Sequence, residues 1–143
     1  MSREYPARPI VGVGAVVWRG DQVLLIRRAK PPRPGRWSLP GGAQKLGETL
    51  AEAAAREVRE ETGVAIAIGP LVDAVDAIER DDNGQVQHHY SLVDFAADWV
   101  TGEPEAGGDA TEATWFTLVE IERLDLWSET LRIIRLAAAR RKR

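Results

Sequence analysis

The chain has 143 residues, a mass of 15.7 kDa and a hydrophobic fraction of 44%, enough for one domain with one core. With 22 acidic and 19 basic residues the formal net charge is -3. This charge argues against a nucleic-acid partner, because basic residues must neutralise the phosphates of such a partner. The absence of cysteine excludes disulfides, thiolate metal sites and cysteine nucleophiles. No apolar stretch is long enough for a bilayer span and no signal-peptide core is readable. We therefore expect one cytoplasmic domain over residues 1–143 that enters no membrane.

The first third of the chain predicts a hairpin followed by a loop. Residues 10–18 and 22–26 are rich in β-branched and aliphatic side chains and flank a Gly-Asp turn, which predicts two paired strands. Residues 29–35 contain three prolines, so they are expected to form an exposed loop that leads to Trp37–Gly42.

One long helix is expected between Thr49 and Thr62, where glycine and proline are absent and Ala, Glu, Arg and Leu dominate. Thr49 and Glu52 have the spacing of a capping box, and Gly63 fits the position just after a helix end. This helix is the strongest secondary-structure prediction of the chain.

The second half predicts a sheet and then helices. We expect strands at residues 64–68, 71–78, 86–99 and 113–118, a polar loop at 101–110, and helices from 119 onward. Asp125 or Ser128 is expected to cap a last helix. Strands on both sides of one long helix, followed by helices, predict an α/β fold with a mixed sheet packed between helices.

Three acidic side chains cluster on the last turns of the expected helix. At 3.6 residues per turn, Glu57, Glu60 and Glu61 fall within an arc of roughly 100°. A hard divalent cation prefers such oxygen ligands, and a phosphate substrate would add more of them. However, Arg56 lies four residues from both Glu52 and Glu60, so a solvated, salt-bridged surface explains the same pattern. The spacing within the helix leaves both interpretations open.

A longer pattern surrounds these acids. Gly42, five residues, Glu48, seven residues and then Arg56-Glu57-Val58-Arg59-Glu60-Glu61-Thr62-Gly63-Val64 meet every specified position of the Nudix box, and the chain resembles the Nudix hydrolases. The box covers 23 of the 143 residues. The resemblance implies the Nudix fold, an α/β/α sandwich with a mixed β-sheet. It also implies hydrolysis of the pyrophosphate bond of a nucleoside diphosphate linked to a group X, with Mg²⁺ or Mn²⁺ as cofactor.

The resemblance also implies roles for individual residues. The metal ligands that it implies are the Gly41 carbonyl, Glu57, Glu60 and Glu61. Arg56 would orient the glutamates, and Glu48 would pair with Arg56 or bind an outer metal ion. The catalytic base would be a box glutamate or an acid of a later loop, where Glu112 is the first candidate and Asp109 and Glu105 are its rivals.

Substrate-binding residues are expected close to the box. The cations that could attract a polyphosphate are Arg27, Arg28, Lys30, Arg33 and Arg36. Trp37 and Trp127 are candidates for stacking on a base, although core packing is the better explanation for most of the five tryptophans. Little chain remains for specificity beyond the loops at 27–36 and 101–112.

The sequence ranks the substrates without deciding between them. The segments His89–Phe95 and Glu112–Phe116 resemble compact bacterial ADP-ribose pyrophosphatase-like members, so ADP-ribose or a related nucleotide sugar is the first expectation. A proline that often follows the box by about sixteen residues in ADP-ribose hydrolases of this family is missing, which weakens that assignment. The alternatives are a (deoxy)nucleoside triphosphate pyrophosphohydrolase and, from another class, a nucleotide-sensing module without catalysis.

The resemblance also leaves open whether the chain forms a homodimer, an assembly common among such proteins.

Overall fold

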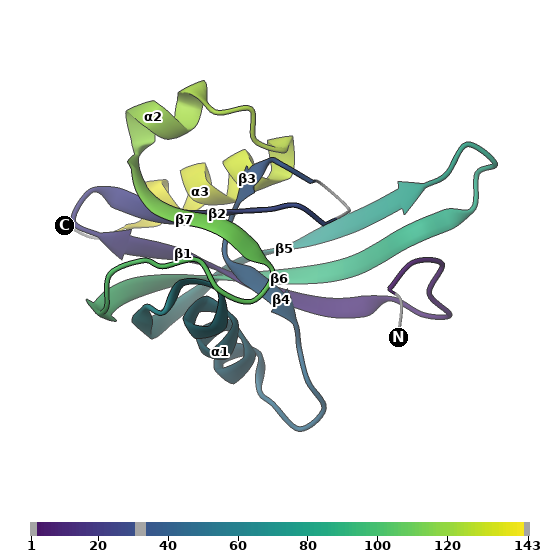
Figure 1. Cartoon of the computed structure of the whole chain (residues 1–143), viewed down its shortest axis with the longest axis horizontal. Coiled ribbons are helices and arrows are strands. Elements are labelled where there is room, and N and C mark those ends of the chain that lie inside the picture. The colour runs from purple at the N-terminus through teal and green to yellow at the C-terminus, as the bar shows by residue number, and fades with distance from the viewer. Residues whose placement is uncertain (1–2, 31–33, 142–143) are drawn as a thin grey trace.

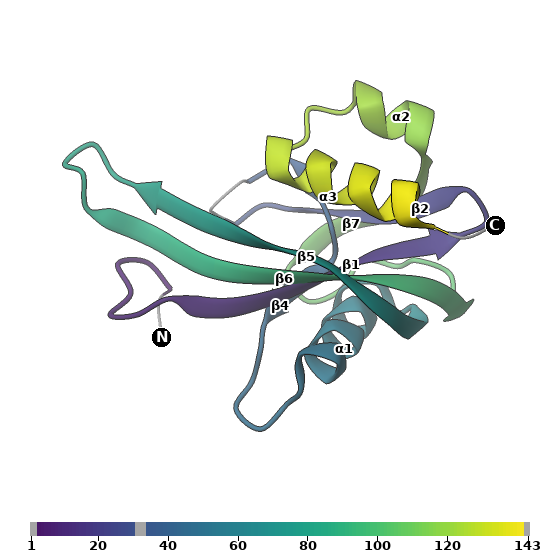
Figure 2. The same cartoon turned by 180° about the vertical axis from the view of Figure 1, so that it is seen from behind.

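A computed structural model describes residues 3–30 and 34–141. The strands are β1 (Ile10–Arg19), β2 (Gln22–Arg28), β3 (Trp37–Ser38), β4 (Gly41–Ala43), β5 (Ala65–Arg80), β6 (Val86–Thr101) and β7 (Ala110–Thr117). The helices are α1 (Leu50–Thr62), α2 (Leu118–Arg123) and α3 (Ser128–Arg140). The seven strands form one mixed sheet, as the sequence predicts, with α1 on one face and α2 and α3 on the other (Figure 1, Figure 2). None of the described helices has both the length and the apolar character needed to cross a bilayer.

The pairing of β1 explains how the Gly41–Ala43 segment reaches the middle of the sheet. The strand order is β3-β2-β1-β6-β5, where β1 and β6 are parallel, and β7 pairs with β2. β1 and β2 pair only next to their connecting turn, at Trp18 with Val23 and Arg19 with Gln22. Farther along, β4 replaces β2 as the antiparallel partner of β1. The two long strands therefore diverge, and the segment that opens the box lies in the gap between them.

Successive side chains of β1 point to opposite faces of the sheet, so they pack into two parts of the core, one beneath α1 and one beneath α3. Val17 packs into a cluster with Val58 of α1, whereas Val16 packs into a cluster with Ile133 and Ile134 of α3. All of these side chains are fully or almost fully buried. A strand whose two faces are both covered anchors the sheet from which the site is built.

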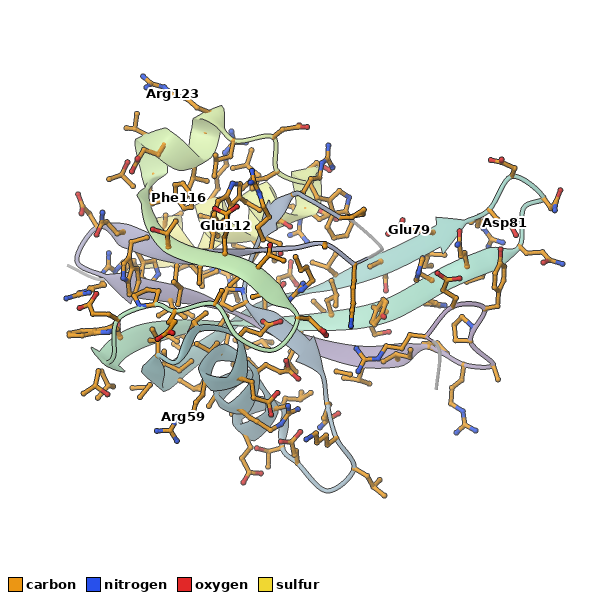
Figure 3. All side chains as sticks on the ribbon, viewed as in Figure 1. Arg59, Glu79, Asp81, Glu112, Phe116 and Arg123 are labelled. Carbon is orange, nitrogen blue, oxygen red and sulfur yellow. The ribbon has the colours of Figure 1, made fainter. Side chains whose placement is uncertain are left out.

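The strands of the second half are longer than expected. Residues 64–68 and 71–78 were expected as two strands, but β5 continues through them as one strand with register shifts near Gly69-Pro70. β7 begins at Ala110 and ends at Thr117, rather than spanning 113–118. The outer ends of β5 and β6 project from the body as a hairpin with Asp81 at its tip (Figure 3). Pairing with a long neighbouring strand extends segments that look short when the sequence is considered locally.

The helix ends show one correct and one wrong prediction. Thr49 caps α1 in the expected capping box with Glu52, and Gly63 ends the helix in the left-handed conformation at φ 72°. For α3 the expected cap at Asp125 or Ser128 is wrong, since Trp127 occupies the cap position and makes no capping side-chain hydrogen bond. The box helix is therefore defined by local sequence, whereas α3 depends on the packing of its apolar face.

Candidate active site

The last turns of α1 lie directly against the glycine pair of β4. A Cβ atom on Gly42 would be 2.5 Å from the carboxyl carbon of Glu57, so only glycine leaves room for that carboxylate. A Cβ atom on Gly41 would collide with the backbone of Val13 in β1. Each glycine therefore permits a close approach, one to the helix and one to the neighbouring strand.

Arg56 organises the acidic residues around it. Its Nε and Nη2 donate to the two carboxylate oxygens of Glu48 at 2.6 and 3.0 Å, and Nη2 also donates to the Ala43 carbonyl at 3.0 Å. Its Nη1 donates to Glu57 at 2.8 Å and to Glu60 at 3.2 Å. The hydrogen bond from Arg56 is the main reason that the pKa of Glu48 falls to about 2, and the pKa of Arg56 is raised in turn. The expected pairing of Arg56 with Glu48 is present, and the positioning role of Arg56 stays a prediction.

Glu61 is the most buried of the three helix acids, with a relative exposure of 4%. One of its oxygens accepts the Gly41 N–H at 2.8 Å, and the other accepts Arg28 Nη2 at 2.6 Å. Burial raises the pKa of Glu61, although the Arg28 charge and these hydrogen bonds act in the opposite direction. Arg28 Nη2 also donates to the Gly41 carbonyl at 3.0 Å, so a cationic group already bridges two of the expected metal ligands.

The carboxylates line one part of a large cavity of about 840 Å³. On the α1 side its lining includes Arg28, Gly41, Gly42, Arg56, Glu57, Glu60 and Glu61. On the α3 side its lining includes Val75, His88, Tyr90, Leu92, Asp94, Trp127, Glu129 and Thr130. This volume lies within the range of small-molecule sites, and the arrangement puts clustered acids at one end of a partly apolar pocket.

The other substrate-binding candidates lie elsewhere. Arg27, Arg36 and Trp37 are not among the described residues that line the cavity, and Arg33 falls outside the described part of the chain. Trp37 packs edge-on against Phe116 with ring centroids 4.9 Å apart, and the Arg27 guanidinium lies 4.8 Å from the Trp37 ring centroid. Arg36 pairs with Asp125 at 3.1 Å. Arg28, Lys30 and Trp127 are the sequence candidates that the structure brings to the cavity.

The three candidates for the catalytic base outside the box lie in different surroundings. Glu112 lies on β7 with Phe116, and its carboxylate accepts Arg27 Nη1 at 3.0 Å, outside the described cavity lining (Figure 3). Asp109 lines the cavity and pairs with Lys30 at 2.9 Å, which lowers the pKa of Asp109. Glu105 uses its backbone N–H to bond the Thr62 carbonyl at 2.9 Å, which ties this loop to the end of α1.

The oxygen atoms near Gly41 are of the type that binds a divalent cation, although the carboxylates among them point toward arginines. Among residues 3–30 and 34–141, no three acidic or histidine side chains converge closely enough to hold a metal ion as they stand. Oxygen donors are nevertheless concentrated at Gly41, Glu57, Glu60 and Glu61, which is the ligand type that Mg²⁺ and Mn²⁺ prefer. The guanidinium of Arg28 between Gly41 and Glu61 marks a position where positive charge is stabilised.

Apart from Trp127, sequence reasoning missed the α3 side of the cavity. His88, Tyr90, Leu92 and Asp94 alternate along β6, so they share one face of the sheet. Nothing in the local sequence distinguishes this face from an ordinary half-buried strand. The burial of Asp94 and His88 becomes visible only once β1, β5 and α3 are in place.

Comparisons with known proteins show what the chain is similar to. Residues 8–137 match the NUDIX domain. An ADP-ribose pyrophosphatase of Methanocaldococcus jannaschii is 38% identical over 116 residues, which are 81% of this chain and 66% of that protein. A putative 8-oxo-dGTP diphosphatase 2 of Mycobacterium tuberculosis is 37% identical over 81% of this chain and 78% of its own length. The crystal structure of a MutT NUDIX hydrolase from Burkholderia pseudomallei superimposes with a TM-score of 0.76 at 30% identity, covering 90% of this chain and 98% of that one.

Proposed function

The chain belongs to the Nudix hydrolase family, whose members act on pyrophosphate bonds, and we propose that it hydrolyses a nucleoside diphosphate linked to a second group, with ADP-ribose first. The observation that carries the proposal is that Glu57, Glu60 and Glu61 of α1 line the same cavity as the Gly41-Gly42 pair of β4. Hydrolysis would release a nucleoside monophosphate and the phosphorylated second group. The proposed partner is therefore a small nucleotide in the cytoplasm.

The proposed cofactor is Mg²⁺ or Mn²⁺, held by the Gly41 carbonyl, Glu57, Glu60 and Glu61. When bound, such an ion polarises the phosphoryl oxygens and lowers the pKa of water. Arg28 bridges the Gly41 carbonyl and Glu61, so it would have to leave these two oxygens for them to hold a cation. The released guanidinium would then contact a substrate phosphate, which agrees with the substrate-binding role expected for Arg28.

The remaining box residues would act by positioning. Arg56 holds Glu57 through Nη1 while Glu48 fixes the Arg56 guanidinium plane from the other side. Such a network keeps a carboxylate close to its working position, and a displacement of about 1 Å can cost 100-fold in rate.

For the catalytic base we propose a box glutamate, with Glu60 first because it lines the cavity and its side chain is half exposed. Glu112 remains the alternative, although it lies on β7 and not in the loop where it was expected. Its carboxylate is held by Arg27 outside the described cavity lining, which favours the box residue. The Glu112→Gln variant separates these two assignments.

ADP-ribose is favoured among the candidate substrates by the archaeal relative, which is named for that activity. The second candidate is a (deoxy)nucleoside triphosphate, favoured by the name of the mycobacterial relative. The third candidate, a sensing module without catalysis, is disfavoured because the box acids are complete and face the cavity.

Product analysis with Mg²⁺ and Mn²⁺ tests this proposal. ADP-ribose, related nucleotide sugars and nucleoside triphosphates would be incubated separately and their products separated by ion-exchange chromatography. AMP with ribose 5-phosphate supports the first candidate, and a nucleoside monophosphate with inorganic pyrophosphate supports the second. Binding of these compounds without turnover under either metal would contradict both. Sedimentation velocity would determine separately whether the chain forms a homodimer.

A further inference from the structure

The α3 side of the cavity contains two buried polar side chains that the proposed hydrolysis does not use. Asp94 and His88 both line the cavity from β6, with relative exposures of 7% and 6%. His88 Nδ1 is buried without a hydrogen-bond partner in the described part of the chain. Burying polar groups in this way is costly unless a partner arrives, so a ligand is one explanation for both.

Asp94 has no hydrogen-bond donor of its own among the residues that the structure describes. The positive charge that acts on it is that of Arg132, whose guanidinium is already bonded to Asp73 at 2.9 Å and Glu129 at 2.6 Å. Burial raises the pKa of Asp94 to about 6, so the carboxylate is ionised at neutral pH at a cost in stability. A buried charge without a donor is typical of a functional position rather than of a stabilising one.

The surroundings of Asp94 combine close packing against β1 with apolar surface in the cavity lining. A side chain on Gly14 of β1 would collide with a carboxylate oxygen of Asp94, and a Cβ atom on Gly12 would be 2.7 Å from Leu92. The two glycines therefore let the side chains of Asp94 and Leu92 lie directly against β1. In the lining of the cavity, Leu92 supplies apolar surface on β6 and Trp127 supplies an aromatic ring at the start of α3. Apolar faces with one acceptor at the edge suit a heteroaromatic base that carries an amino group.

We propose that Asp94 is a specificity residue that accepts a hydrogen bond from the exocyclic amino group of the substrate's nucleobase, which lies against Leu92 and Trp127. This inference rests on the proposed function, because it assigns the α3 side of the cavity to the base and the α1 side to the pyrophosphate. Both ends belong to one cavity, so a single nucleotide occupies them together. An amino group would provide the donor that the described residues do not give to Asp94.

The test compares two mononucleotides that differ only in this amino group. AMP and purine riboside 5′-monophosphate, which has hydrogen in place of the 6-amino group, would be titrated by calorimetry in EDTA, so that neither metal binding nor turnover contributes. The wild-type protein should bind AMP at least about tenfold more tightly, since a lost hydrogen bond to a charged acceptor has that magnitude. AMP is a suitable probe because it is shared by ADP-ribose and ATP.

Variants assign the preference to Asp94. In Asp94→Ala the two nucleotides should bind within about twofold of each other, and Asp94→Asn, which keeps one carbonyl acceptor, should retain part of the preference. Asp98→Ala is the matched control, because Asp98 lies on the same strand, is exposed and is not among the described residues of the cavity lining. This control should preserve the wild-type preference.

A stability measurement distinguishes recognition from a structural role. Without ligand, Asp94→Asn should unfold at the same temperature as the wild type or higher at pH 8, because it removes a buried charge. A lower unfolding temperature together with an unchanged AMP preference would overturn the proposal.

Equal binding of the two nucleotides by the wild type, or no saturable AMP binding, would also overturn it, even if ADP-ribose is hydrolysed. Conversely, a preference for AMP that Asp94→Ala removes would support the inference even if no pyrophosphate bond is cleaved. The failure of this inference and the failure of the proposed function are thus distinguishable.

Discussion

The close contact between Gly42 and Glu57 allows the carboxylate position to be tested without removing any metal ligand. In a Gly42→Ala variant the new Cβ atom would lie 2.5 Å from the Glu57 carboxyl carbon, whereas ordinary contacts begin at 3.4 Å. The carboxylate must therefore move by about 0.9 Å or rotate away from the glycine. Because a misplacement of about 1 Å can reduce rates 100-fold, we expect kcat/KM to fall by about that factor.

Stability should change much less than activity in this variant. The atoms that must move are at the end of a flexible side chain, so we expect a loss of only about 1 kcal/mol, or about 3 °C in Tm. Gly41→Ala provides the contrast, because its Cβ atom would meet the backbone of Val13 and disturb the pairing of β1 with β4. That variant should lose several degrees in Tm.

The assay is the initial rate of pyrophosphate hydrolysis as a function of Mg²⁺ concentration, with thermal unfolding measured in parallel. The Gly42→Ala variant should need more Mg²⁺ for half-maximal activity, because one ligand is displaced. A kcat/KM close to the wild type at saturating Mg²⁺ would refute the reasoning, as it would mean that the position of the Glu57 carboxylate does not matter.

Three further predictions concern positioning, proton transfer and pH. Arg56→Lys should lower kcat by about tenfold or more with a nearly unchanged fold, since an ammonium cannot hold Glu48 bidentately and also reach Glu57; unchanged steady-state kinetics would contradict this. Glu112→Gln should leave kcat within about threefold if a box glutamate is the base, and a loss of about 100-fold or more would return that role to Glu112. The pKa of Asp94 rises from 3.8 to about 6 on folding, so stability should fall as the pH rises from about 4 to about 6, by about 3 kcal/mol in total. Urea unfolding from pH 4 to 8 should show this loss in the wild type and not in Asp94→Asn, and equal slopes would contradict the assignment.

Local sequence predicted the half of the site that is built within one helix. The capping box at Thr49, the stop at Gly63 and the shared face of Glu57, Glu60 and Glu61 all depend on neighbours within a few turns.

The other half depends on partners that are distant in the sequence. Arg28 reaches Glu61 because β2 diverges from β1 and lets β4 between them, which no local pattern reports. Asp94 becomes a buried acceptor only when β6 pairs with β1 on one side and α3 covers the sheet. Trp37 was a reasonable stacking candidate, but long-range packing against Phe116 gives it another place.

The central claim is that the box carboxylates support metal-dependent cleavage of a pyrophosphate bond, and Glu57→Gln tests it most directly. Formation of AMP and ribose 5-phosphate from ADP-ribose should be measured for the wild type and this variant, each with Mg²⁺ and with EDTA. The account predicts products only for the wild type with Mg²⁺, and a loss of several orders of magnitude in the variant while its Tm stays close to that of the wild type. Equal product formation in EDTA, or a near-normal rate in Glu57→Gln, would contradict it.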